Sequence, residues 1–223
     1  MSSAETYLRE RIRRSGPVTF HEFMETALYH PEFGYYRRAK DPFGREGDFF
    51  TAEQLQPVFG ILIAARIRSL FEEMGKPAGF RVVELGAGRR EMADALSAFA
   101  YVPLEFGDPL PARLTGVVFS NEFFDALPVH AAVRRRAGWN EMRVDWRDQR
   151  FTWHEGGEAP EKVSWYLDRF GGSPEEGTLA EANLDAIRWL EKISKCLERG
   201  YVFTIDYGYT NRELVLFPRG TLM

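Results

Sequence analysis

The amino-acid sequence predicts an α/β fold built around a parallel sheet. Three short apolar runs have the composition of buried strands, at residues 81–85, 116–120 and 201–205. Each run contains an acidic residue or is followed by one within two positions, and stretches with helical composition separate the runs. This alternation is typical of sheets whose strands run parallel and whose helices cover the faces. With 223 residues, the chain is long enough for one such domain with additions.

Composition narrows the class of protein. The chain is 44% hydrophobic and 28% charged, which is ordinary for a globular protein. Its net charge of −4 gives no reason to expect nucleic acid as a partner. The longest apolar run, near residues 58–65, is too short to cross a bilayer, and residues 1–14 lack the apolar segment of a secretory signal. A single cysteine, Cys196, cannot form an internal disulfide, so we expect a reducing, cytoplasmic location.

Two short helices are predicted ahead of the first strand. Ser2 and Glu5 have the spacing of a capping box, in which a hydroxyl and a carboxylate satisfy the first amides of a helix. Gly16, followed by proline, ends that helix. Thr19 and Glu22 repeat the same spacing and predict the start of the second helix.

A loop and a long helix complete the N-terminal part. Residues 41–51 are rich in glycine and predict a loop. Residues 52–74 predict a helix with an apolar face, and Gly75 supplies its C-cap.

The turn after the first strand carries the main chemical signal. Gly86, Ala87 and Gly88 follow residues 81–85, and Glu84 lies two residues before the first glycine. Glycine permits positive φ angles and a close approach of the backbone to a ligand. A strand followed by such a turn is the unit that binds nucleotide-like cofactors at the carboxyl end of its strand.

The spacing within this turn selects among cofactors. Residues 89–96 have helical composition, and we expect a helix whose first amides add a partial positive field. The dinucleotide fingerprint requires glycine where Glu91 stands, which disfavours hydride transfer. The pattern instead resembles the first motif of class I S-adenosylmethionine (SAM) methyltransferases. That resemblance implies that Glu84 reaches the amino group of SAM and that the turn packs against its methionine part. A tight turn without a ligand is the alternative.

The middle of the chain is short for such a fold. SAM-binding folds usually place two strands and two helices between residue 96 and the strand at 116–120, so we expect one strand–helix unit to be missing or compressed. Glu105 and Asp108 are the candidates for the acids that meet the ribose and adenine of the cofactor in these folds. A solvated turn acid is the alternative for each of them.

A second group of polar residues follows the strand at 116–120. Asn121, Glu122 and Asp125 stand at its carboxyl end, where open α/β sheets bind their ligands. The two phenylalanines between them suit the core better than a substrate cage. A glutamate directly after a buried strand is costly unless it has a partner or a function. We therefore predict Glu122 as the main catalytic residue, with Asn121 and Asp125 as the other catalytic candidates.

The C-terminal half predicts a small antiparallel insertion and one clear helix. Residues 130–155 alternate apolar and charged side chains and predict a β-meander, and residues 181–199 predict a helix. Residues 156–177 predict a polar, turn-rich connection with one short segment at 163–170. The four histidines have no metal-ligand spacing, so we predict no metal site. Five arginines on the meander indicate either a solvated strand face or a surface for an acidic partner: Arg134, Arg135, Arg136, Arg143 and Arg147.

Together, these motifs resemble the MidA-type SAM-dependent methyltransferases, whose mitochondrial members assist the assembly of respiratory complex I as protein arginine methyltransferases. The most specific matches are Tyr29-His30-Pro31 with Gly34-Tyr35-Tyr36, and Asn121-Glu122 with Asp125-Ala126-Leu127-Pro128. Further matches lie at residues 47–51, 83–88 and 206–209.

The resemblance implies a class I SAM-methyltransferase (Rossmann-like) sheet, shortened in the middle and lacking a C-terminal hairpin. Residues 1–75 would form a helical extension with a cofactor-lid loop, and residues 76–223 the SAM-binding domain with the meander at about 130–155. Asp48 and Thr51 would line the cofactor site. One departure stands out, because the family usually has glycine at the position of Arg90.

The expected function is methyl transfer from SAM to a protein arginine side chain, with Glu122 facing the methyl acceptor. By resemblance, the protein substrate would be a respiratory-complex subunit, and neither nucleic acid nor a membrane span is expected. Two alternatives stay open. One is a catalytically impaired relative that acts as an assembly or binding module, and the other is methylation of a small molecule.

Overall fold

The computed structural model describes residues 3–37 and 57–222. The chain divides into two compact units, each assembled from separate stretches. The antiparallel unit comprises Met1–Ala39, Leu127–Ile187 and Gly208–Met223, and the parallel unit comprises Lys40–Ala126 and Arg188–Tyr207. The division at residue 75 and the lid role of the preceding loop stay predictions.

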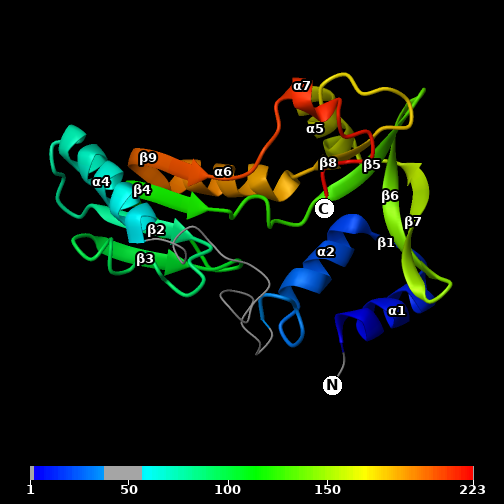
Figure 1. The fold of residues 1–223 in the computed structure, drawn as a ribbon, viewed down its shortest axis with the longest axis horizontal. Coiled ribbons are helices and arrows are strands. Elements are labelled where there is room, and N and C mark those ends of the chain that lie inside the picture. Colours follow the sequence, from blue (N-terminus) through cyan, green and yellow to red (C-terminus); the bar gives the residue numbers. More distant parts are fainter. Residues whose placement is uncertain (1–2, 38–56, 223) are drawn as a thin grey trace. The chain divides into compact units, whose positions relative to one another are not determined.

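A parallel sheet of four strands forms the centre of the parallel unit (Figure 1). The strands lie in the order β3-β2-β4-β9, and each neighbouring pair is parallel. This arrangement confirms the predicted α/β fold, and β3 is the strand that occupies the short middle of the chain. The strands are β2 (Arg81–Leu85), β3 (Ala100–Leu104), β4 (Leu114–Asn121) and β9 (Leu197–Ile205).

The order of the strands creates a point where the chain changes direction across the sheet. From β2 the chain passes to β3 on one side, whereas β4 pairs with β2 on the other side. Open α/β sheets bind ligands outside the carboxyl ends of the strands at such a point. Because Leu85 is paired with Ser120, the turns that follow β2 and β4 leave the sheet side by side.

Helix α4 (Pro57–Glu73) buries its apolar face against this sheet. The first part of the predicted helix, residues 52–56, lies outside the described residues. Gly75 has a φ of +77°, and its N–H donates to the carbonyl of Glu72 at 2.8 Å, which confirms the predicted C-cap. The buried residues in this core are Ile63, Ala64, Ile67, Leu70, Met74, Phe80, Val82, Met92, Leu96, Val117 and Phe119.

The predicted helix at residues 89–96 is wrong, because turns occupy residues 88–98. Arg90 has a φ of +61°, a left-handed conformation that cannot continue a right-handed helix. The N–H of Arg90 donates to Ala87, and that of Ala93 donates to Arg90, which is the three-residue spacing of turns. The expected field of a helix N-terminus beside the glycine turn is therefore not supported.

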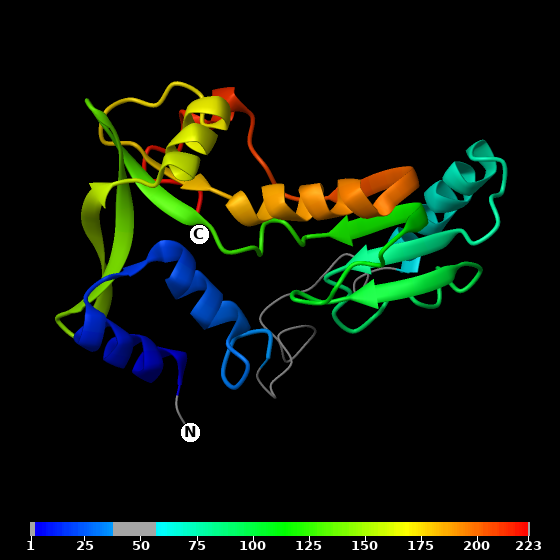
Figure 2. The same cartoon turned by 180° about the vertical axis from the view of Figure 1, so that it is seen from behind.

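The antiparallel unit is built on the predicted meander (Figure 2). The meander strands are β5 (His130–Arg135), β6 (Gly138–Arg147) and β7 (Arg150–Glu158), which confirms the prediction. Strands β1 (Val18–Thr19) and β8 (Leu179–Ala182) extend this sheet by pairing with β6 and β5. Helix α5 (Glu161–Phe170) covers it, with Val163 and Leu167 in the core.

Three further helices belong to the antiparallel unit: α1 (Ala4–Ser15), α2 (Phe20–Tyr29) and α7 (Asn211–Leu214). The N-cap of α1 is Ser3 and not the predicted Ser2, because the hydroxyl of Ser3 accepts from the N–H of Thr6 at 3.2 Å. The second cap is confirmed, since Thr19 Oγ1 accepts from the N–H of Glu22 at 3.0 Å.

Helix α6 (Leu184–Cys196) is shorter than the predicted helix at 181–199. Strand β8 takes the residues before it, and β9 begins directly after it. Asn183 caps α6, since its Oδ1 accepts from the N–H of Ala186 at 2.9 Å. None of the helices in the described part of the chain has both the length and the apolar character that crossing a membrane requires.

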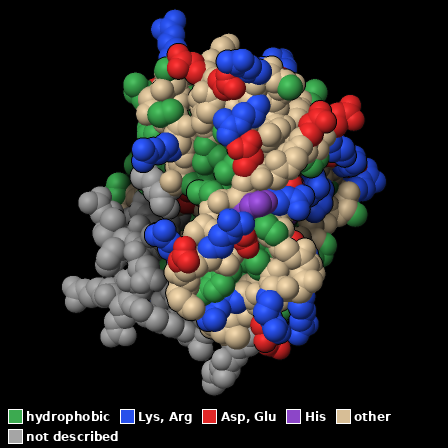
Figure 3. Space-filling model, turned by 90° about the vertical axis from the view of Figure 1, so that its right-hand side faces the viewer, with side chains coloured by type: hydrophobic (Ala, Val, Ile, Leu, Met, Phe, Trp, Pro, Cys, Tyr) green, Lys and Arg blue, Asp and Glu red, His purple; other side chains and the backbone are tan. Residues whose placement is uncertain are grey.

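Each of the five meander arginines forms an ion pair within the chain. The partners are Asp168 for Arg134, Glu155 for Arg135, Glu176 for Arg136, Glu141 for Arg143 and Asp145 for Arg147. Figure 3 shows acidic and basic side chains interspersed on the face that it draws. These contacts favour the interpretation of a solvated strand face over a surface for an acidic partner.

Candidate functional site

The turn after β2 has the geometry that its glycines predict. Gly86 and Gly88 adopt positive φ angles of +68° and +50°. The N–H of Gly86 donates to the carbonyl of Leu104 at 2.8 Å, which holds the turn against the end of β3. Glu84, near the end of β2, is buried with 5% of its surface exposed. A buried carboxylate therefore stands beside a turn whose backbone is open to close approach.

Tyr101 on β3 is a partner of Glu84 that the sequence did not reveal. Its hydroxyl donates a hydrogen bond to Glu84 Oε2. Burial, reinforced by this hydrogen bond, raises the pKa of Tyr101 far above its usual value, so the hydroxyl keeps its proton. Tyr101 pairs with Val82, and the period of two along a strand places Val82 and Glu84 on the same face of the sheet. Only the strand register reveals this contact.

Replacing Tyr101 by phenylalanine is expected to weaken binding of S-adenosylhomocysteine (SAH) up to about tenfold, because Glu84 loses a hydrogen bond that fixes its carboxylate. Calorimetric titration of the variant with SAH measures this effect. Tyr7→Phe, on helix α1 of the antiparallel unit, serves as the matched control. Equal affinity of the Tyr101 variant and the control would contradict a positioning role.

Glu105 and Asp108 also lie at this edge of the sheet. Glu105 directly follows β3, and its Oε1 accepts from the N–H of Gly88 at 2.7 Å. Asp108 Oδ2 accepts from the N–H of Glu105 at 2.8 Å. The structure thus brings Glu105 to the glycine turn, whereas Asp108 stabilises the turn that carries Glu105. Their roles toward ribose and adenine stay predictions.

The turn after β4 contacts the turn after β2. Phe123 is 4% exposed, which agrees with its predicted place in the core. A Cβ atom added to Gly86 would lie 2.9 Å from Phe123 Cδ2, so only glycine lets the two turns approach this closely. Asn121 ends β4, and the N–H of Glu122 donates to the carbonyl of Ile205 at 2.9 Å.

Three carboxylates gather at the ends of β4 and β9. Burial raises the pKa of Asp125 to about 6, and the neighbouring charges of Asp206 and Glu122 add to the shift. Like charges disfavour one another's ionised forms, so a proton on the carboxyl of Asp125 reduces the repulsion among the three side chains. Glu122 and Asp125, two of the predicted catalytic residues, are therefore close enough to interact.

Asp125 should make stability depend on pH in one direction. Its pKa is raised from 3.8 to about 6 on folding, so the folded state holds a proton that the unfolded state releases between these values. Its contribution to stability is therefore greatest below pH 4 and is lost as the pH rises through 6. Urea unfolding at a series of pH values should show wild type losing stability relative to Asp125→Asn between pH 4 and pH 6. High salt should reduce this loss, because it screens the repulsion by Asp206 and Glu122. If the free energies of unfolding of wild type and Asp125→Asn change with pH in parallel, the raised pKa of Asp125 is contradicted.

Asp48 and Thr51, which the family resemblance placed in the cofactor site, lie outside the described residues. Their predicted role is not tested. In the described ranges, no group of three or more His, Cys, Asp or Glu side chains is arranged to hold a metal ion.

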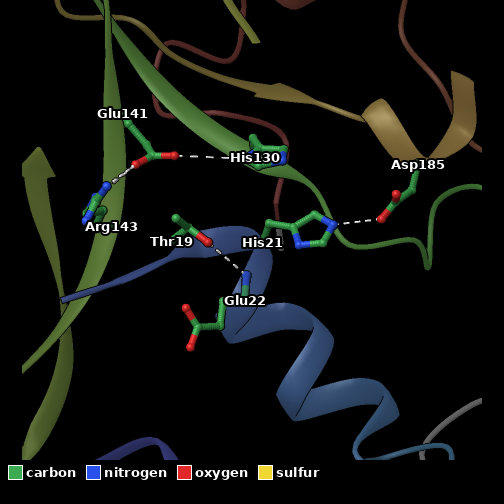
Figure 4. A network of polar contacts seen from close by, with 7 residues as sticks. All are labelled: Thr19, His21, Glu22, His130, Glu141, Arg143 and Asp185. Carbon is green, nitrogen blue, oxygen red and sulfur yellow. Dashed lines mark hydrogen bonds and ion pairs between the residues drawn. The ribbon is translucent and has the colours of Figure 1, made fainter. Parts of the chain in front are cut away.

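A second polar cluster, shown in Figure 4, lies within the antiparallel unit. His21 Nε2 lies 2.7 Å from Asp185 Oδ2, and the ring of His21 stacks on that of His130 with 4.8 Å between centroids. Glu141, 4% exposed, accepts from Arg143 Nε at 2.8 Å and has its Oε1 4.0 Å from His130 Nδ1. These contacts tie α2 to β5, β6 and the start of α6, and the histidine spacing alone did not indicate them.

Comparison with known proteins places this geometry in a family. A family model described as "Putative S-adenosyl-L-methionine-dependent methyltransferase" matches residues 100–223. The protein arginine methyltransferase NDUFAF7 homolog of Drosophila melanogaster is 29% identical over 191 residues, covering 62% of this chain and 44% of that protein. The human protein arginine methyltransferase NDUFAF7 is 28% identical over 195 residues, with the same coverage of 62% and 44%. The chain thus spans less than half the length of these curated relatives.

Solved structures agree with this relationship. A COG1565 superfamily member from Burkholderia thailandensis, bound to S-adenosyl-homocysteine, superposes with a TM-score of 0.79 at 28% identity. That superposition covers 92% of this chain and 62% of the other. A second crystal structure of a COG1565 superfamily protein from the same organism gives a TM-score of 0.71 at 27% identity. These likenesses confirm the predicted class I SAM-methyltransferase fold.

The match of the family model extends over more than half of the sequence, including β3, β4, β9 and the turn that carries Glu122. The chain therefore belongs to this family of S-adenosyl-L-methionine-dependent methyltransferases.

Proposed function

We propose that this chain transfers a methyl group from SAM to an arginine side chain of a protein. The observation that carries the proposal is the juxtaposition of two turns at the point where the sheet changes direction. The turn after β2 brings Glu84 and two glycines, and the turn after β4 brings Glu122. Open α/β sheets bind ligands at this place.

The side chains around the glycine turn fit SAM. The carboxylate of Glu84 suits the amino group of the methionine part, and a carboxylate has enough lone pairs to accept from both Tyr101 and an ammonium group. Glu105, held at Gly88, suits ribose hydroxyls. Gly86 leaves room for Phe123, and Gly88 adds no side chain that would block a ligand. When bound, SAM supplies a methyl group already activated on a sulfonium.

The turn after β4 would hold the methyl acceptor. An arginine guanidinium has a pKa above about 12 and arrives charged, so it is a poor nucleophile until it is oriented. The carboxylate of Glu122 can accept two parallel hydrogen bonds from it and help to localise a lone pair on the attacking nitrogen. Asn121 and Asp125 would shape the turn, and Phe124 would exclude water. Alignment of nitrogen, methyl and sulfur then supplies much of the rate.

The relatives support a protein substrate, because those from fly and human carry the name protein arginine methyltransferase. A respiratory-complex subunit, suggested by the family resemblance, is the first protein substrate to test. A buried Cys196 is compatible with the reducing, cytoplasmic location that we propose.

The proposal is tested by incubating the chain with methyl-labelled SAM and peptides that differ only in carrying arginine, lysine or alanine at one position. Label on the arginine peptide alone is the expected result. Label on the lysine peptide would show that the same site methylates an amine instead of a guanidinium. A folded sample that binds SAH and labels none of them would favour the second candidate, a non-catalytic binding module. Arg90 favours that candidate, since it places a side chain beside the glycine turn where the family usually has glycine, and this side chain would crowd the carboxylate of SAM.

A further inference from the structure

The motif that begins at Asp206 has no role in the mechanism so far. Asp206 directly follows β9, the neighbour of β4 in the sheet, and Asn121 at the end of β4 pairs with Ile205. Asp206 therefore emerges beside the turn that carries Glu122.

Asp206 ties that turn to the end of β9. Its Oδ2 accepts from the N–H of Phe124 at 2.8 Å, a contact between residues 82 positions apart in the chain. Its Oδ1 accepts from the N–H of Tyr207 at 2.9 Å. A second tether runs from the N–H of Glu122 to the carbonyl of Ile205 at 2.9 Å. The residues on either side of Phe123 are thus both bonded to the end of β9.

These tethers explain the backbone conformation of Glu122. Its φ of +50° lies in the left-handed region, which costs a residue with a side chain about 1–2 kcal/mol. Strain of this kind persists only where the surroundings impose it, and it concentrates at functional sites. Because Glu122 N–H and Phe124 N–H are both held, neither of the two peptide units that carry them can rotate without losing a hydrogen bond.

Asp206 also acts on the turn through its charge. It is one of the two carboxylates whose repulsion helps to raise the pKa of Asp125 to about 6, the other being Glu122. A change at Asp206 should therefore be visible both in the conformation of the turn and in the titration of Asp125.

We propose that Asp206 is a positioning residue, which fixes the turn after β4 through Phe124 N–H and so presents Glu122 to the methyl acceptor. The inference rests on the proposed function, because Glu122 is the residue whose placement Asp206 would control. Under this proposal, Asp206 influences methyl transfer by positioning Glu122 and does not itself contact the substrate.

Two substitutions separate the hydrogen bond from the charge. Asp206→Ala removes both, and displacement of Glu122 by about 1 Å is expected to lower kcat about 100-fold with SAH affinity unchanged. Asp206→Asn keeps an oxygen that can accept from Phe124 N–H, so kcat should fall by no more than about tenfold. The pKa of Asp125, followed by carboxyl NMR, should fall in both variants.

A matched control is Glu213→Ala. Glu213 is another acid that accepts from a main-chain N–H, that of Thr210 at 2.7 Å, and it lies in the antiparallel unit. Its loss should leave kcat unchanged. A general loss of stability would not produce two of these results: the higher kcat of Asp206→Asn relative to Asp206→Ala, and the lower pKa of Asp125.

If the wild-type chain methylates the peptide and Asp206→Ala does so with the same kcat, the inference is overturned, whereas the proposed function is retained. Loss of SAH binding in proportion to kcat would also overturn it, because the variant would then be damaged as a whole. Absence of turnover in the wild type would overturn the proposed function instead. In that case the amide resonances of Glu122 and Phe124 decide the inference, since unchanged resonances in Asp206→Ala would show that no tether exists.

Discussion

Replacing Glu122 by glutamine is expected to lower the rate of methyl transfer about 100-fold or more while leaving affinity for SAH unchanged. Glutamine has nearly the same shape, but it cannot accept two charge-assisted hydrogen bonds from a guanidinium. The loss should fall on kcat, because orientation of the attacking nitrogen matters most in the transition state. Initial rates with labelled SAM, together with calorimetric titration with SAH, measure the two effects separately.

Glu84→Gln is the matched control for that experiment, since the two glutamates lie at the ends of neighbouring strands but would serve different ligands. It is expected to weaken SAH binding about 10- to 100-fold through loss of a charge-assisted hydrogen bond to the amino group. Unchanged turnover in Glu122→Gln would remove Glu122 from the mechanism. A similar loss of SAH affinity in both variants would show that the two turns serve the same ligand.

Replacing Gly116 by alanine is expected to prevent folding or to destabilise the chain by more than about 4 kcal/mol. Gly116 pairs with Arg81 on β2 and with Gly200 on β9, and its φ is +150°. A Cβ at Gly116 would lie 1.9 Å from the carbonyl oxygen of Arg81, and one at Gly200 would lie 1.8 Å from that of Gly116. The clashing atoms are backbone atoms of a buried sheet and cannot move aside.

Gly138→Ala separates the clash from the backbone strain. Gly138 has nearly the same φ, +148°, but a Cβ there would meet nothing within 4 Å. It should lose only about 1–3 kcal/mol from the unfavourable conformation. Urea unfolding followed by tryptophan fluorescence compares the two variants. Equal midpoints would show that the three strands do not approach as closely at Gly116 as described.

The sequence was informative wherever one local pattern decided the structure. Apolar runs predicted β2, β4 and β9. The residues that follow β2 and β4 in the sequence indicated the edge of the sheet at which the candidate site lies. Gly86 and Gly88 predicted the positive φ angles of the turn. Each of these features depends on a few consecutive residues.

Features that depend on tertiary contacts were not predictable. Residues 89–96 have helical composition, yet the left-handed Arg90 turns the chain instead. Pairing with β5 made a strand of residues 179–182, where the predicted helix was to begin, although Asn183 could have been recognised as the cap of α6. The contacts of Tyr101 with Glu84 and of Asp206 with Phe124 depend on strand register and order, which a single sequence does not provide.

The most direct test of the central claim, that the turns after β2 and β4 form a SAM site, is calorimetric titration of this chain with SAH. A single site with a dissociation constant of about micromolar strength is the expected result. It would show that Arg90 leaves the site able to bind and would justify the search for methyl acceptors. A sample that unfolds cooperatively in urea but releases no heat with SAH, and gains no thermal stability from it, would contradict the claim.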